Sequence, residues 1–127
     1  SDPAESIGAI GGRVYIAERR GNVAGSCAVV PRRGGVMEIK WLAVDPEWQR
    51  LGIGRRLLTR GAGYARRHGA IRVVTVTSER LSPALRLYRR FGFETAPAPP
   101  DLLQPPGGIY MQLELASAGI VTDLAHV

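Results

Sequence analysis

The sequence has one cysteine, two histidines and no long apolar segment among its 127 residues. Cys27 has no second cysteine with which to form an internal disulfide, so we expect a cytoplasmic location. Together with His68 and His126 it does not supply a convincing zinc ligand set, and we expect no metal. No apolar run approaches the ~20 residues that span a bilayer, and residues 1–6 lack the basic start and apolar stretch of a signal peptide. We therefore expect no membrane partner.

Aromatic residues make up only 6% of the chain, and all but one of its basic residues, Lys40, are arginines. The net charge of +6 favours anionic partners such as nucleic acid or phosphorylated small molecules. A stacking platform for bases needs more aromatic side chains than this. Because the arginines are spread along the chain, we interpret most of the charge as solvated surface. A basic nucleic-acid binder, whose affinity would fall steeply with salt, is the alternative.

Hydrophobic periodicity predicts six strands and two amphipathic helices in a single domain. The predicted elements are strands at 14–18, 23–30 and 36–44, a helix from 52 to about 68, a strand at 71–77, a helix at 82–91, a short strand from Phe93 and a strand at 109–115. This order predicts an α/β fold with a mixed, mostly antiparallel central sheet and covering helices. The domain is expected at 13–115, after an N-terminal segment 1–12 that is tag-derived or truncated and before a loosely attached tail at 116–127.

The segment Gln49–Gly54 joins the end of a strand to the start of a helix at two glycines, Gly52 and Gly54. At such a junction the first helical N–H groups have no internal acceptor, and the helix dipole adds positive potential. Glycines let the backbone approach an anion without a Cβ atom, and Arg50 and Arg55 lie beside them. The pattern predicts a phosphate-binding site that is neither a P-loop nor a dinucleotide fingerprint. A glycine-rich turn without a ligand is the alternative.

The stretch Gln49-Arg50-Leu51-Gly52-Ile53-Gly54 is similar to the Gln/Arg-x-x-Gly-x-Gly/Ala signature of the GNAT superfamily of N-acetyltransferases. Residues 42–46 (Leu-Ala-Val-Asp-Pro) and 87–93 (Leu-Tyr-Arg-Arg-Phe-Gly-Phe) resemble two further ordered motifs of that family. The resemblance spans about residues 13–115. It implies an enzyme that transfers an acetyl group from acetyl-CoA to a primary amine by direct attack in a ternary complex. The alternative is a non-catalytic module that binds coenzyme A as a sensor or scaffold.

The same resemblance implies a set of site residues and a pair of splayed strands, 36–44 and 71–77, that form a slot for the thioester. The residues expected to bind acetyl-CoA are Leu42, Ala43, Val44, Gln49, Arg50, Leu51, Gly52, Ile53, Gly54 and Arg55. The strand edge at 42–44 would pair with the pantetheine amides, and a backbone N–H at Val44 or its neighbour would polarise the thioester carbonyl. Tyr88 would donate a proton to the departing thiolate, with a role in core packing as its alternative.

Amide formation also needs a group that accepts the proton lost by the amine, and a carboxylate serves for this. Glu38 is the best candidate because it lies on strand 36–44 beside the expected slot. A solvent-facing or salt-bridged Glu38 is the alternative, and Glu79 is a second candidate base. Cys27 lies in the apolar stretch 24–30, so we expect a small buried hydrophobe, with a reactive thiol as the alternative. Because Cys27 is remote in sequence from the motifs, we expect no acetyl-cysteine intermediate.

Two departures from the family pattern affect the expected cofactor and acceptor sites. Leu81 stands where many relatives carry an asparagine, so one cofactor contact is missing or comes from Ser78 or Ser82. The family begins with a strand and two helices that wall the acceptor site, and only about twelve residues precede the first strand here. We expect these elements to be missing, which leaves the cleft open or completed by a partner, for example in a homodimer. The loop 95–108 is then the main local determinant of the acceptor.

Overall fold

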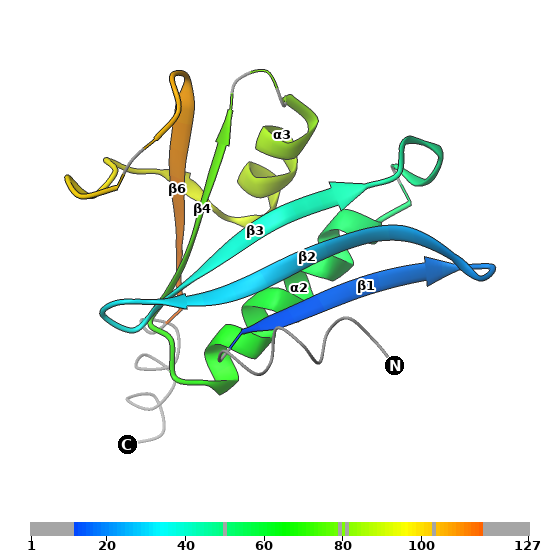
Figure 1. Cartoon of the computed structure of the whole chain (residues 1–127), viewed down its shortest axis with the longest axis horizontal. Coiled ribbons are helices and arrows are strands. Elements are labelled where there is room, and N and C mark those ends of the chain that lie inside the picture. The colour runs from blue at the N-terminus through cyan, green and yellow to red at the C-terminus, as the bar shows by residue number, and fades with distance from the viewer. Residues whose placement is uncertain (1–11, 50, 79, 81, 103, 116–127) are drawn as a thin grey trace.

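The β-branched and alternating stretches form strands, and the two amphipathic stretches form α-helices, in the predicted order (Figure 1). The computed structural model describes residues 12–49, 51–78, 80, 82–102 and 104–115. Its elements are β1 (Arg13–Arg19), β2 (Asn22–Arg32), β3 (Val36–Val44), the 3₁₀ turn η1 (Pro46–Trp48), α2 (Ile53–Arg67), β4 (Arg72–Ser78), α3 (Ser82–Phe91), β5 (Glu94–Thr95) and β6 (Gly108–Glu114). The expectations for residues 1–11 and for the tail 116–127 lie outside the described residues.

The strands form one six-stranded sheet in the order β1-β2-β3-β4-β6-β5. Every neighbouring pair is antiparallel except β3 and β4, which run parallel and pair only from Val36↔Arg72 to Glu38↔Val74. Beyond that point the two strands diverge, while β3 stays paired with β2 and β4 stays paired with β6. Figure 1 shows β3 and β4 starting together and separating toward α3. The mixed sheet and the splayed strand pair are therefore confirmed.

Helix α2 packs across β1, β2 and β3, and α3 packs on β4 and contacts α2. The predicted apolar face of α2 is buried in the core, and Tyr64, which the periodicity did not include, is buried with it. A Cβ at Gly61 would lie 2.8 Å from Ile39 Cδ1, so this glycine permits the close approach of helix and sheet. Neither α2 nor α3, the α-helices of the described part of the chain, is long and apolar enough to cross a bilayer.

Cys27 lies in this core, with 1% of its surface exposed. Its Sγ lies 3.7 Å from the Leu57 carbonyl oxygen of α2, and burial raises the pKa of the thiol from 9.0 to about 12. The thiolate, which is the reactive form, is therefore suppressed at neutral pH. The expectation of a small buried hydrophobe is confirmed.

Candidate active-site cleft

The loop between β3 and α2 is held by its own polar side chains. Asp45 Oδ1 accepts a hydrogen bond from the Glu47 N–H (2.9 Å), and Pro46 occupies the first position of the 3₁₀ turn. The Asp45 N–H donates to the Ala24 carbonyl of β2 (2.8 Å), and Gln49 Nε2 donates to the Val44 carbonyl (3.2 Å). These bonds fix the direction in which the chain enters α2. Gln49, expected to contact a cofactor, uses its side chain to close this turn.

The N-terminus of α2 presents backbone N–H groups and positive charge together. The Arg56 N–H donates to the Gly52 carbonyl (3.0 Å), so the N–H groups of residues 53–55 precede the hydrogen-bond ladder of the helix. Gly52 has no side chain with which to cap them, and the first turn contains no acidic residue. Arg55 and Arg56 lie instead at the positive end of the helix dipole, where a cation is unfavourable. A bound anion would offset the unfavourable interaction of these two arginines with the helix dipole.

The two glycines of the motif are required for different structural reasons. Gly52 has φ of +81°, a left-handed conformation that suits glycine, and no atom lies within 4 Å of its missing Cβ. A Cβ at Gly54 would lie 2.6 Å from Leu87 Cδ2 and 3.7 Å from Val44 Cγ2. Gly54 therefore lets α3 pack closely against α2, a constraint that sequence reasoning assigned to the approach of an anion alone.

A β-bulge in β3 determines how residues are oriented along the part of this strand that diverges from β4. Trp41 has φ of +54°, and the β2–β3 register shifts between Ser26 and Ala28. Before the bulge the odd-numbered residues of β3, such as Ile39, are buried toward α2; after it Leu42 and Val44 pack against the core instead. The bulge thus leaves the Trp41 side chain 67% exposed. A positive φ for so bulky a residue is uncommon and strained.

The peptide groups of β3 alternate between its two edges. The Val44 carbonyl points away from β2 because it accepts from Gln49, whereas the next N–H, that of Asp45, points to β2. By alternation the Leu42 peptide group shares the Val44 edge, and Ala43 faces β2, where it lies opposite Ser26. In the described part of the chain no strand pairs with β3 on that edge beyond Glu38.

Between the splayed strands lies a cleft of about 520 Å³. Its walls are residues 38–42 of β3, 75–77 of β4, Ala84 and Tyr88 of α3, Arg32 of β2, and Leu102 and Pro105 of the loop before β6. The two predicted catalytic residues, Glu38 and Tyr88, therefore line the same cavity although they are 50 positions apart in the sequence. The loop predicted to contact the acceptor contributes two of the walls.

Tyr88 enters the cleft from α3 and is 4% exposed. Its ring packs edge-on against Phe93 at 5.3 Å between centroids, and its hydroxyl forms a hydrogen bond with Thr75. Thr75 Oγ1 in turn donates to the Ile39 carbonyl across the splay (2.9 Å). Burial raises the pKa of the Tyr88 hydroxyl above its ordinary value, and the hydrogen bond with Thr75 opposes part of that rise. The hydroxyl therefore keeps its proton at neutral pH, as a general acid must.

Glu38 is held by Arg32, whose Nε donates to Glu38 Oε1 across 2.7 Å. The Glu38 side chain is 12% exposed and that of Arg32 is 41% exposed. The structure thus has the salt-bridged arrangement that sequence reasoning kept as an alternative. Arg32 was not predicted as a site residue, although a tight hairpin between β2 and β3 places it opposite Val36 and diagonal to Glu38.

The predictions for Arg50, Glu79 and Leu81 concern residues that lie outside the described part of the chain, as does the side chain of Ser82. Leu51 and Arg55 are exposed at the start of α2, and Ile53 is buried beneath it. The helix entrance and the cleft are adjacent, because Val44 and Leu87 lie beside Gly54 while Tyr88, the next residue of α3, lines the cleft.

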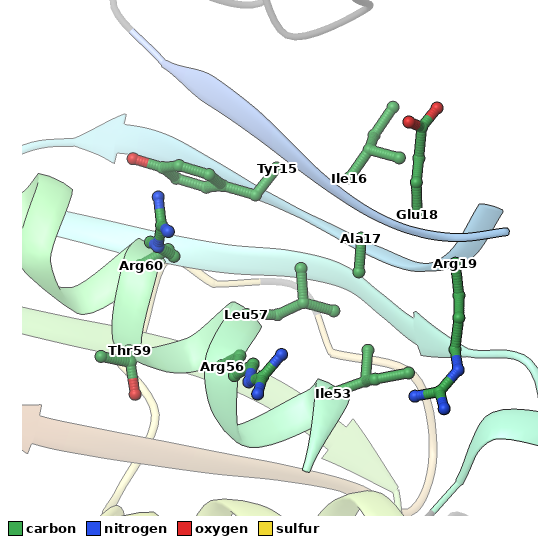
Figure 2. Close-up of a pocket in the computed structure, with 10 residues that line it drawn as sticks. All are labelled: Tyr15, Ile16, Ala17, Glu18, Arg19, Ile53, Arg56, Leu57, Thr59 and Arg60. Atoms are coloured by element: carbon green, nitrogen blue, oxygen red, sulfur yellow. The ribbon is translucent and has the colours of Figure 1, made fainter. Parts of the chain in front are cut away.

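A second hollow, of about 550 Å³, lies between β1 and α2. Figure 2 shows Tyr15, Ala17 and Arg19 of β1 directed toward α2, while Ile16 and Glu18 point away from it. Arginines of α2 and β1 rim this groove, and apolar side chains floor it. Of the predicted site residues that the structure describes, it contains only Ile53.

Comparison with known proteins gives concordant results. A family model described as an acetyltransferase (GNAT) domain matches residues 11–95. The chain is 34% identical over 119 residues to an uncharacterized N-acetyltransferase of Schizosaccharomyces pombe, covering 91% of this chain and 72% of that protein.

Two solved structures show the same fold. A GNAT-family acetyltransferase from Staphylococcus aureus superposes with a TM-score of 0.79 at 17% identity, over 87% of this chain and 72% of that one. A Bacillus subtilis acetyltransferase in complex with CoA superposes with a TM-score of 0.68 at 23% identity, over 82% of this chain and 77% of that one.

Proposed function

Because the chain belongs to the GNAT acetyltransferase family, we propose that it transfers an acetyl group from acetyl-CoA to a primary amine, by direct attack in a ternary complex. The observation that carries this proposal is that a helix entrance with free N–H groups and no acidic residue lies beside a cleft lined by a buried tyrosine and a carboxylate. The Bacillus subtilis structural relative was solved with CoA, which supports the same donor here.

The diphosphate of the donor binds at the entrance of α2. The N–H groups of residues 53–55 donate to its oxygens, and Arg55 adds charge. Gly52 supplies the left-handed turn that exposes those amides, with Leu51 and Gln49 forming the approach. Such binding would relieve the repulsion between the helix dipole and the two arginines of its first turn.

The pantetheine arm lies along the free edge of β3. An extended chain that pairs with a strand edge satisfies its amides as an added strand does. The peptide groups of Leu42 and Val44 face that edge, while Ala43 contributes its small side chain and the spacing between them. The thioester then enters the splay, where the Val44 N–H or its neighbour polarises the carbonyl.

In the chemical step the neutral amine nitrogen attacks the thioester carbon, and the C–S bond breaks as the tetrahedral intermediate collapses. Tyr88 gives its proton to the departing sulfur, which is why a hydroxyl that stays protonated at neutral pH is useful there. Glu38 takes the proton lost by the amine. Arg32 binds Glu38 Oε1, so we assign the proton to Oε2.

The test is release of free thiol from acetyl-CoA in the presence of a panel of primary amines, with the acetylated products identified by mass spectrometry. We expect stoichiometric thiol and N-acetyl product. Binding of acetyl-CoA without thiol release from any amine of the panel would instead identify a non-catalytic coenzyme A sensor or scaffold, and would overturn the proposal.

A further inference from the structure

Among the described residues that line it, the cleft carries an unbalanced positive charge. Strand alternation places Glu38 and Lys40 on the face of the sheet away from α2, since Ile39 between them is buried beneath that helix. Of the described residues that line the cleft, the charged ones are Arg32, Glu38 and Lys40. Arg32 and Glu38 neutralise one another in their ion pair. Lys40 is the surplus cation.

The Lys40 ammonium is oriented by an aromatic ring. It lies 5.2 Å from the centroid of the Trp41 ring, and among the described residues no salt bridge engages it. A cation held over an indole keeps its hydrogen-bond donors available to a further partner. Lys40 is thus a positioned cation whose charge no acidic side chain of the described chain offsets.

Trp41 adds an apolar surface beside that cation. The bulge holds it in a left-handed conformation and leaves its side chain 67% exposed at the lip of the cleft. Strained backbone of this kind clusters at functional sites. Exposure of the largest apolar side chain at a cleft entrance suits contact with an apolar or planar part of a ligand.

The spacing of Glu38 and Lys40 limits the shape of the acceptor. Two residues apart on one strand, their side chains leave the same face about 7 Å from one another. A carboxylate bound at Lys40 would therefore hold an amine a few bonds away, directed toward Glu38. Polycationic acceptors are disfavoured at the same position, because a second ammonium would meet Lys40.

We infer that the acceptor is a carboxylate-bearing amine of the amino-acid type with an apolar or aromatic side chain. Lys40 binds its carboxylate and Trp41 contacts its side chain. This inference rests on the proposed function, because it assigns the second substrate of that reaction. The subsite involves no residue of the donor site, so the two assignments can be tested apart.

The experiment compares kcat/KM, by thiol release, for phenylalanine and for phenethylamine, which is the same amine without the carboxylate. A charge-assisted hydrogen bond predicts a preference for phenylalanine of about tenfold or more, carried mainly by KM. Lys40→Met should abolish most of that preference. Arg33→Met, which removes an exposed cation in the β2–β3 turn, is the matched control and should retain it.

Trp41→Gly provides a second variant that keeps the bulge, because glycine adopts positive φ readily. It should raise KM for phenylalanine relative to KM for alanine.

Equal kcat/KM for phenylalanine and phenethylamine in the wild type, or an unchanged ratio in Lys40→Met, would overturn the acceptor assignment while leaving the acetyltransferase intact. A fall in coenzyme A affinity in place of the KM change would also overturn it. Absence of thiol release with every amine would overturn both proposals.

Discussion

Two hollows in the described part of the molecule have nearly equal volumes, about 550 Å³ between β1 and α2 and about 520 Å³ between β3 and β4, and they differ in chemistry. The first is a groove of arginines over an apolar floor, on strands that stay paired throughout. The second exists because two strands stop pairing, and it gathers a buried tyrosine, a carboxylate and unpaired strand edge. The two hollows cannot be distinguished by volume. They differ because β3 and β4 stop pairing in the second one, which exposes backbone peptide groups to a ligand.

The largest contrast between the two hollows is expected from a matched pair of tyrosine variants. Tyr88→Phe removes the proposed acid of the cleft and should lower turnover by about a hundredfold or more, with donor affinity little changed. Tyr15→Phe removes a hydroxyl from the groove and should leave turnover near the wild-type value. Steady-state thiol release and titration with coenzyme A measure the two quantities. Equal rates for Tyr88→Phe and the wild type would remove Tyr88 from the mechanism.

A pair of glycines in α2 tests how closely the cleft wall packs. Gly54→Ala should destabilise the fold by about 1–3 kcal/mol, because the new Cβ would lie 2.6 Å from Leu87 Cδ2. Gly63→Ala meets only the end of the Arg67 side chain, at 3.2 Å, and should stabilise the helix by up to about 1 kcal/mol. Urea denaturation measures both. If Leu87→Ala fails to rescue Gly54→Ala in the double variant, the clash is not the cause.

Whether a structural feature could be predicted from the sequence depends on how far apart along the chain its interacting residues lie. The bounds of β3 were predicted to the residue, because the Gly34-Gly35 turn and Asp45-Pro46 stop the strand by local backbone chemistry. The amphipathic α2 and its buried face followed from periodicity in the same way. Such features depend on neighbours in the chain.

The features that were missed depend on how separate strands pair and how separate helices pack. The bulge at Trp41 arises from a register shift between β2 and β3, which no periodicity within Val36–Val44 encodes. The Arg32–Glu38 ion pair follows from the same register. Gly54 was read as a residue of the anion site, but its contact with Leu87 depends on how two helices meet. The splay itself was implied by family resemblance and not by the residues alone.

Alkaline pH should weaken the core that lies between the two hollows. Cys27 contacts the Leu57 carbonyl on the groove side, and its charge would act on Tyr88 in the cleft. The pKa of its thiol is about 12 in the folded state and 9.0 unfolded, so the unfolded chain loses the proton first as pH rises. The stability is therefore present below pH 9.0 and lost progressively toward pH 12. We expect the free energy of unfolding to fall by about 1.4 kcal/mol between roughly pH 8 and 10.

Cys27→Ala isolates this contribution, since it removes the titrating group while the tyrosines remain. The free energy of unfolding of this variant should be lower at neutral pH because packing is lost, and it should change less with pH over the same interval. Urea denaturation at several pH values gives both slopes. Parallel slopes for the variant and the wild type would show that Cys27 does not govern the alkaline loss.

The smallest effect concerns which arginines of α2 contact the donor. Arg55 lies at the helix entrance and Arg60 lines the groove one and a half turns later. Arg55→Gln should weaken coenzyme A binding by about three- to tenfold, because it removes the proposed charge-assisted contact to phosphate, which solvent partly screens. It should also make the affinity for coenzyme A depend less steeply on salt concentration.

Arg60→Gln carries the same change in net charge, so a purely long-range effect of charge would weaken binding equally in the two variants. Calorimetric titration at two salt concentrations separates these cases, and a larger loss from Arg60→Gln would move the diphosphate away from the helix entrance and into the groove.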